Sequence, residues 1–186
     1  MDAWWHEAWV TLVAEFADIT DAKQVTQVSV RLLMAALLGA VLGFEREMKG
    51  KAAGVRTHML VAIGAALFVL VPRMAGADDA ALSRVVQGIV AGIGFLGAGT
   101  ILKGRDMVAS HVKGLTTAAG LWMTAAIGVA AGMGREATAL LSTILALLVF
   151  AVMPWVVDLF EDKEHKKGAG GKVEEDMDED DKGGNA

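Results

Sequence analysis

Long apolar runs, separated by short polar connections, make up most of the chain. Five runs approach the length of about 20 residues that a helix needs to cross the hydrocarbon of a bilayer. They occupy residues 25–44, 55–71, 85–102, 115–133 and 137–157. A soluble protein of 186 residues has no core large enough to bury five such helices on all sides. The pattern therefore predicts an all-α membrane protein in which residues 25–157 form a domain of five transmembrane helices.

The first 24 residues show a different pattern. Apolar side chains recur at helical spacing, opposite to acidic ones. They are Trp5, Trp9, Leu12, Phe16 and Ile19. The acids, and the lack of a basic segment ahead of them, argue against a signal peptide. We expect residues 1–24 to form an amphipathic helix at the membrane interface; the alternative is an extension packed on the helix bundle.

The charge is concentrated at the other end of the chain. Residues 158–186 hold 11 of the 22 acidic residues but only 5 of the 17 basic ones. Such a segment cannot bury a core, so we predict a disordered acidic tail. The remaining chain is almost neutral, which gives no basic surface for nucleic acid. The absence of cysteine excludes thiolate metal sites and thiol nucleophiles.

Basic residues predict the orientation in the membrane. The connection between the first two runs, at residues 45–54, is rich in Lys and Arg, and Arg56 follows it. Positively charged connections stay in the cytoplasm. With five crossings, this places the C-terminus in the cytoplasm and the N-terminus on the outer side of the membrane, which would be the periplasm for a protein of a bacterial inner membrane.

Glycines predict how the helices pack, because helices in lipid associate where small residues let their backbones approach. G-x-x-x-G pairs occur in the first, third and fourth runs, which we expect to form the tight centre and to support a homodimer. The candidate packing residues are Gly39, Gly43, Gly88, Gly92, Gly94, Gly97, Gly99, Gly128 and Gly132. The segment at 92–97 also matches the dinucleotide-binding pattern G-x-G-x-x-G. It lies inside an apolar run, so we interpret it as helix packing or a locally unwound helix.

Polar residues at the ends of the runs meet on the predicted cytoplasmic side. This polar mouth comprises Glu45, Arg46, Glu47, Arg56, Thr57, His58, Lys113, Thr116 and Thr117, with Lys103, Arg105 and Asp106 at the end of the third run. Two helix N-termini point to this side, an arrangement that suits an anion such as phosphate or a lipid headgroup. The alternative is ordinary interfacial anchoring with ion pairs such as Glu45–Lys49. We expect no metal site, because Glu45 and Glu47 point about 200° apart on a helix and cannot both hold one ion. We also expect no cofactor, because the G-x-G-x-x-G segment lies inside an apolar run.

One charge, Arg31, lies clearly inside an apolar run. Intramembrane charges are candidates for function. The alternatives are snorkelling to the interface, or pairing with a helix carbonyl or an acid such as Asp78. His58 and His111 belong to no H-E-x-x-H motif, so hydrolytic metal chemistry has no support.

Four blocks of sequence, in order, resemble the MgtC/SapB family of bacterial inner-membrane proteins. They lie at residues 31–47, 53–60, 92–102 and 112–122. The resemblance implies a five-helix membrane domain, a link to growth at low magnesium and to survival inside host phagocytes, and in some members inhibition of the proton-translocating ATP synthase. Gly120 stands where the family usually has Thr.

Together these features predict a non-enzymatic membrane protein of ion homeostasis and of stress or virulence adaptation. It would act through helix contacts with itself or with a membrane partner such as the ATP synthase, surrounded by membrane lipid. The alternative is a transporter or channel for Mg²⁺ or another small solute.

Overall fold

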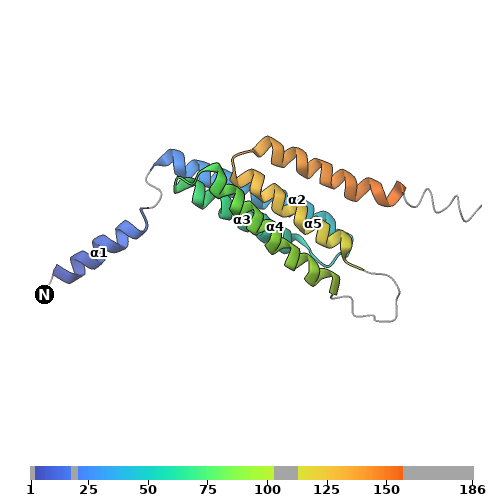
Figure 1. Ribbon diagram of the computed structural model, residues 1–186, viewed down its shortest axis with the longest axis horizontal. Helices are drawn as coiled ribbons and strands as arrows, with labels where there is room; N and C mark the ends of the chain where they lie inside the picture. Colours follow the sequence, from blue (N-terminus) through green and yellow to red (C-terminus); the bar gives the residue numbers. More distant parts are fainter. Residues whose placement is uncertain (1–2, 18–20, 103–112, 157–186) are drawn as a thin grey trace, which may run out of the picture. The chain divides into compact units, whose positions relative to one another are not determined.

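The computed structural model describes residues 3–17, 21–102 and 113–156, and the regular structure in these ranges is helical. The helices are α1 (Ala3–Glu15), α2 (Ala22–Met48), α3 (Val55–Met74), α4 (Asp79–Leu102) and α5 (Leu115–Gly132), followed by an unlabelled last helix, Glu136–Val156 (Figure 1). The five helices after α1 are long and apolar enough to cross a membrane. The predicted fold class is therefore confirmed. The acidic tail, the basic residues of 103–106 and His111 lie outside the described ranges.

The chain divides into two compact units, residues 1–144 and 145–186. In the second unit, the described residues complete the last helix. In the first, α1 is helical as expected, its described side chains are exposed, and the rings of Trp4 and Trp5 stack with centroids 3.7 Å apart. The packing described below belongs to α2–α5 of the first unit.

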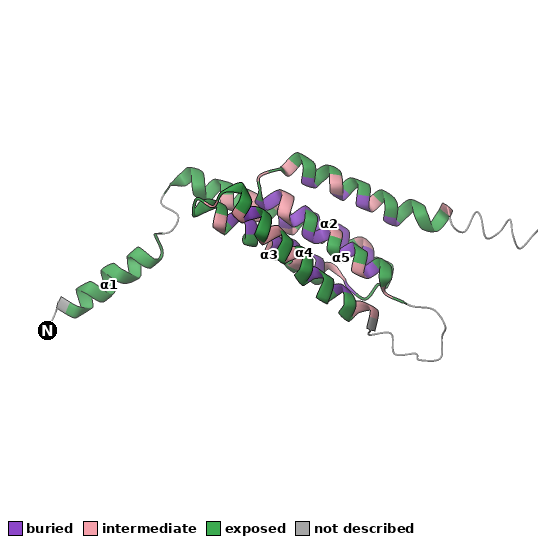
Figure 2. Ribbon diagram, viewed as in Figure 1, coloured by how far each residue is buried: buried purple, intermediate pink, exposed green. Residues whose placement is uncertain are grey.

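Helix α3 is the centre of this packing. Helices α2 and α5 pack mainly on α3, whereas α4 packs mainly on α5. The buried positions of α3 are mostly small, with Ala62, Ala65 and Ala66 at most 4 % exposed. Figure 2 shows that most of the buried positions follow the facing sides of α2, α3 and α5, while green, exposed positions cover their outer sides. Our expectation that the helices now labelled α2, α4 and α5 form the centre is wrong, because the alanines of α3 offer the small face that the glycines need.

The glycines of α2 and α5 allow this close approach. A Cβ added at Gly39 would lie 2.7 Å from the carbonyl oxygen of His58, and one at Gly43 would lie 2.6 Å from the Cα of Val55. On the other side of α3, a Cβ at Gly128 or Gly132 would strike the backbone of α3. These four positions are therefore packing glycines, as predicted.

The glycines of α4 behave differently. Added Cβ atoms at Gly88, Gly92, Gly94 and Gly99 would meet no atom within 4 Å, whereas one at Gly97 would lie 3.3 Å from Ala118 of α5. The helix continues unbroken through this segment. Of our two interpretations, the locally unwound helix is therefore excluded, and among the described residues only Gly97 of this group packs closely on another helix.

Glycines also end the helices. Gly134 has a φ of +74°, and the N–H of Arg135 donates to the carbonyl of Ala130 while that of Gly134 donates to Ala131. This is the Schellman motif, in which a left-handed glycine satisfies carbonyls left free at the last turn. Gly50 and Gly76 end α2 and α3 in the same way. The connections that follow α2, α3 and α5 are therefore short, and they bring polar side chains of one helix to the end of another.

Candidate functional site

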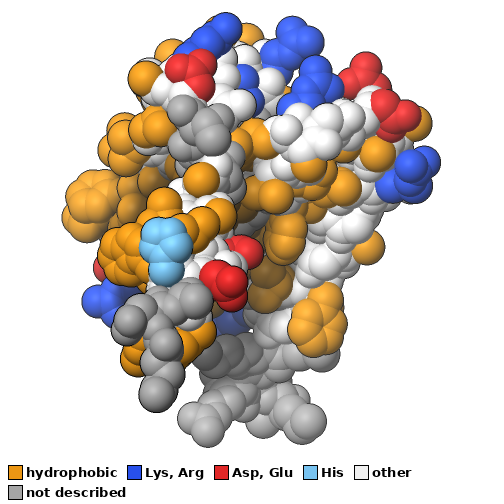
Figure 3. Space-filling view, turned by 90° about the vertical axis from the view of Figure 1, so that its left-hand side faces the viewer, with side chains coloured by type: hydrophobic (Ala, Val, Ile, Leu, Met, Phe, Trp, Pro, Cys, Tyr) orange, Lys and Arg blue, Asp and Glu red, His pale blue; other side chains and the backbone are white. Residues whose placement is uncertain are grey.

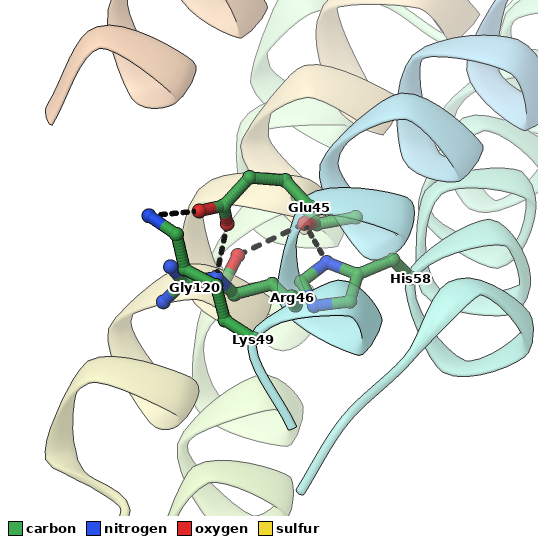
Figure 4. A network of polar contacts seen from close by, with 6 residues as sticks. Glu45, Arg46, Lys49, His58 and Gly120 are labelled. Atoms are coloured by element: carbon green, nitrogen blue, oxygen red, sulfur yellow. Dashed lines mark hydrogen bonds and ion pairs between the residues drawn. The ribbon is translucent and has the colours of Figure 1, made fainter. Parts of the chain in front are cut away.

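The last turns of α2 carry a charged network. The carboxylate of Glu45 accepts a hydrogen bond from Nε of Arg46 and pairs with Lys49, whose Nζ lies 2.7 Å from Oε1 (Figure 4). Arg46 is only 2 % exposed, although it stands near the end of a helix. The predicted ion pair Glu45–Lys49 is present. Because a buried arginine needs a nearby acceptor, Glu45 compensates the charge of Arg46 inside the structure.

Glu47 points away from this network, toward α3. Its Oε2 accepts a hydrogen bond of 2.9 Å from the backbone N–H of Val55, the first residue of α3. The N-cap residue, Gly54, has no side chain to do this, and a Cβ added there would lie 2.5 Å from Oε2 of Glu47. A carboxylate at this position also complements the positive end of the helix dipole. One of the two helix N-termini that we proposed for an external anion therefore holds a carboxylate of the chain itself.

One turn into α3, His58 is fully buried against α2 and α5. Its Nδ1 lies 2.7 Å from Oγ1 of Thr124, which donates to the carbonyl of Gly120 at 2.9 Å (Figure 4). Because the hydroxyl has one proton and uses it on Gly120, it accepts from His58, so Nδ1 carries the imidazole proton. The opposite nitrogen, Nε2, is buried and has no hydrogen-bond partner among the described residues.

Arg31 lies at the opposite end of the bundle from Glu45. Its Nη1 donates to the carbonyl oxygen of Gly132 over 3.3 Å, and its guanidinium lies against the backbone of Gly134, where an added Cβ would be 2.6 Å from Nη2. The pairing with a helix carbonyl that we considered is present, and a cation at this end of α5 is favourable. Asp78, the other partner considered, instead caps α4 by accepting from the N–H of Ala81.

The remaining residues of the predicted mouth fall into two groups by their exposure. Arg56, Thr57, Lys113 and Thr116 are exposed, and Thr117 is buried in the first turn of α5. The mouth therefore separates into a buried part, formed by Arg46, His58 and Thr117 with the partly buried Glu45, and an exposed rim. Within the described residues, no three His, Asp or Glu side chains come together to hold a metal ion.

Thr124 is the functional-site residue that the sequence analysis missed. It lies in an apolar run without charge, and a single threonine in such a run does not by itself indicate a polar site. The available signal was its spacing: Gly120, Thr124, Gly128 and Gly132 recur every fourth residue and share the face of α5 that is buried. A lone hydroxyl on a small-residue face predicts a polar partner on the helix that packs there.

A comparison with protein families matches residues 32–159 to the model of the MgtC family. The chain belongs to the MgtC family. The match covers α2 from residue 32 onward, α3–α5 and the last helix, together with every residue of the predicted mouth. Arg31 lies one position before its start. A multi-pass membrane protein follows both from this membership and from the five long apolar helices.

Curated relatives in the MgtC family give the same result. The chain is 48 % identical to "Protein SrpB" of Synechococcus elongatus over 132 residues, which is 66 % of this chain and 72 % of the relative. It is 41 % identical over 130 residues to the "Putative magnesium transporter YhiD" of Escherichia coli K12, covering 66 % and 59 %. It is 42 % identical over 135 residues to "Protein MgtC" of Brucella abortus, covering 73 % and 55 %. The chain thus spans less than two thirds of the length of YhiD and MgtC. No solved structure matches it.

Proposed function

We propose that this MgtC-family protein is a non-enzymatic regulator of magnesium homeostasis that acts by helix–helix contact inside the membrane. Its partner would be a second copy or another membrane protein, and the family resemblance makes the ATP synthase one candidate. The observation that carries the proposal is the small-residue face of α4. The glycines of α2 and α5 are used inside the chain, whereas Gly88, Gly92 and Gly99 of α4 have open space beside them.

The three glycines share one side of α4, because steps of four and seven residues return to nearly the same side of a helix. Beside them, α3 and α4 enclose an apolar groove of about 660 Å³, which includes Leu60, Phe68 and Leu96 in its walls. Phe68 is 64 % exposed and Leu60 is 70 % exposed. Small residues flanked by large apolar ones favour close packing of another transmembrane helix.

Leucine substitutions on this face test the proposal without disturbing the fold. We expect Gly88→Leu and Gly92→Leu to reduce crosslinking of the protein to its partner in native membranes and to impair growth in low magnesium. Gly94→Leu is the matched control, because Gly94 has the same open surroundings but lies about 200° around α4 from Gly92. Equal behaviour of all three variants and the unmodified protein would overturn the role of this face.

A second candidate function is transport of Mg²⁺ or another small solute. It is favoured by the 41 % identity to a relative named as a putative magnesium transporter. Purified protein in sealed proteoliposomes, loaded with a magnesium-sensitive dye, separates the two functions. Mg²⁺ uptake that is faster than in protein-free vesicles, and that is lost in Glu45→Gln, would establish transport. Uptake equal to that of protein-free vesicles, in a preparation that crosslinks to its partner, supports the regulator.

A further inference from the structure

A second cavity lies at the end of the bundle where α3 and α5 end and α4 begins. Its volume is about 420 Å³, and its walls include Arg73 of α3, Asp79 and Ser83 of α4, and Arg135 after α5. Figure 3 views this end of the helices and shows Lys and Arg side chains along the upper edge, together with Asp and Glu and next to hydrophobic ones. None of these residues belongs to the networks described above.

The charged side chains in the walls of this cavity carry a net positive charge. Arg73 donates to Asp79 over 2.9 Å, and this pair is largely exposed. The guanidinium of Arg135 makes no hydrogen bond or ion pair with the described residues, and only its backbone N–H is used, in the Schellman motif. Ser83 adds a hydroxyl donor. Two guanidinium groups against one carboxylate favour an anion, and guanidinium groups bind phosphate with matching geometry.

The cavity also has apolar residues in its walls, among them Val69, Leu82 and Val86, and a groove lies next to it between α4 and α5. This groove has a volume of about 240 Å³ and is lined by Val86, Ile89, Ile93 and Trp122 among others. Val86 lines both spaces, so the polar cavity and the apolar groove adjoin at this residue of α4. From Val86 to Ile93 the groove follows about 10 Å of helix. A phosphate group in the cavity would therefore have an apolar path beside it.

We infer that this end of the bundle binds an anionic phospholipid, with its phosphate at Arg135 and Arg73 and an acyl chain in the groove between α4 and α5. The arrangement fits an amphipathic ligand because the polar and apolar parts adjoin at Val86. A free phosphate would use only the cavity, and an apolar helix would leave the guanidinium of Arg135 without an acceptor. The lipid would thereby clamp the ends of α3, α4 and α5 together.

Thermal unfolding of the full chain in detergent tests the headgroup. We expect phosphatidylglycerol to raise Tm, while phosphatidylcholine and inorganic phosphate leave it almost unchanged. In Arg135→Gln the apparent affinity for phosphatidylglycerol should fall about tenfold, the effect of losing one charge-assisted hydrogen bond. Arg84→Gln is the matched control, since Arg84 is exposed on the same end of α4 but does not line the cavity. Arg135→Lys should retain part of the response if Arg135→Gln fails to fold.

Fluorescence of Trp122 tests the acyl chain. In a variant whose other tryptophans are replaced by Phe, phosphatidylglycerol brominated on its acyl chains should quench Trp122 more than phosphatidylcholine brominated in the same way, and Arg135→Gln should make the two equal. Equal quenching in the parent variant, or a Tm response to phosphatidylglycerol that survives in Arg135→Gln, would overturn the inference. A Tm response that inorganic phosphate reproduces would show a simple anion site and overturn the lipid.

Discussion

At the scale of single residues, Glu47 connects two helices by capping one from the other. It is in the last turn of α2, and its carboxylate satisfies the first N–H of α3. Helix N-termini leave N–H groups without partners, and a missing cap costs about 1 kcal/mol. Here the cap comes from eight residues upstream, because Gly54 at the usual position has no side chain.

Removing this cap should loosen the connection between α2 and α3. We expect Glu47→Ala to lower the free energy of unfolding by about 1–2 kcal/mol, and Glu47→Gln by less, because the amide oxygen still accepts but the charge at the helix dipole is lost. Unfolding in mixed micelles with increasing dodecyl sulfate measures both. Lys51→Gln, exposed in the same connection, is the control. Stability of Glu47→Ala equal to that of the control would contradict the capping role.

Gly54 provides a second measurement of the same contact. A Cβ there would crowd the Glu47 carboxylate, so Gly54→Ala should destabilise the parent protein more than it destabilises Glu47→Ala. The difference in such a double-mutant cycle reports the interaction between the two positions. Equal costs in both backgrounds would show that Glu47 is not what requires glycine at position 54.

For His58, by contrast, we predict that substitution changes the stability very little. Its Nδ1–H bond to Thr124 is offset by the buried Nε2, which lacks a partner among the described residues. An apolar residue of similar size removes both the hydrogen bond to Thr124 and the unpartnered Nε2. The hydroxyl of Thr124 still donates to the carbonyl of Gly120. We therefore expect His58→Leu to unfold within about 1 kcal/mol of the parent protein. A loss several times larger would show that Nε2 is satisfied by a group such as a buried water. Normal stability with failed growth in low magnesium would assign the imidazole a role in function.

At the scale of elements, the helices were predictable and their neighbours were not. Hydropathy alone located the five long helices, because a bilayer imposes their length. Partners depend instead on which small faces match in register. Gly39 and Gly128 gave the correct packing faces. The small face of α3 is made of alanines, with Ala62 and Ala66 four residues apart, and it was overlooked because only pairs of glycines were considered, so α4 was expected in place of α3. Likewise, the charges at the helix ends correctly indicated Glu45 and Glu47 as site residues. The sequence could not show that Glu45 pairs with Arg46 and Lys49 whereas Glu47 caps α3, because this depends on the direction in which each side chain points.

The central position of α3 predicts unequal costs for substitutions in small residues. Gly128→Leu places a side chain into the backbone of Ala62. Overpacking usually costs about 1–3 kcal/mol, and because the contact here is with backbone, we expect a cost of more than about 2 kcal/mol. Gly64→Leu should cost less than about 1 kcal/mol, because Gly64 lies on α3 beside open space. Unfolding in dodecyl sulfate measures both variants. Equal costs would contradict the arrangement of α5 on α3.

At the scale of the whole molecule, the sequence predicts an orientation that single cysteines can measure. The natural chain contains no cysteine, so each introduced thiol is the only one. Ala52 lies exposed between α2 and α3, and Ala75 lies exposed between α3 and α4, on the other side of one crossing. With positive charges held in the cytoplasm, Ala75→Cys should react with an impermeant maleimide in intact cells, and Ala52→Cys should react only after permeabilisation. Leu67→Cys, within α3 between them, should resist the reagent in both conditions, because thiols in hydrocarbon rarely ionise. The reverse pattern at positions 52 and 75 would invert the protein and place the cavity at Arg135 on the cytoplasmic side. Equal labelling of all three would contradict the membrane-spanning arrangement itself.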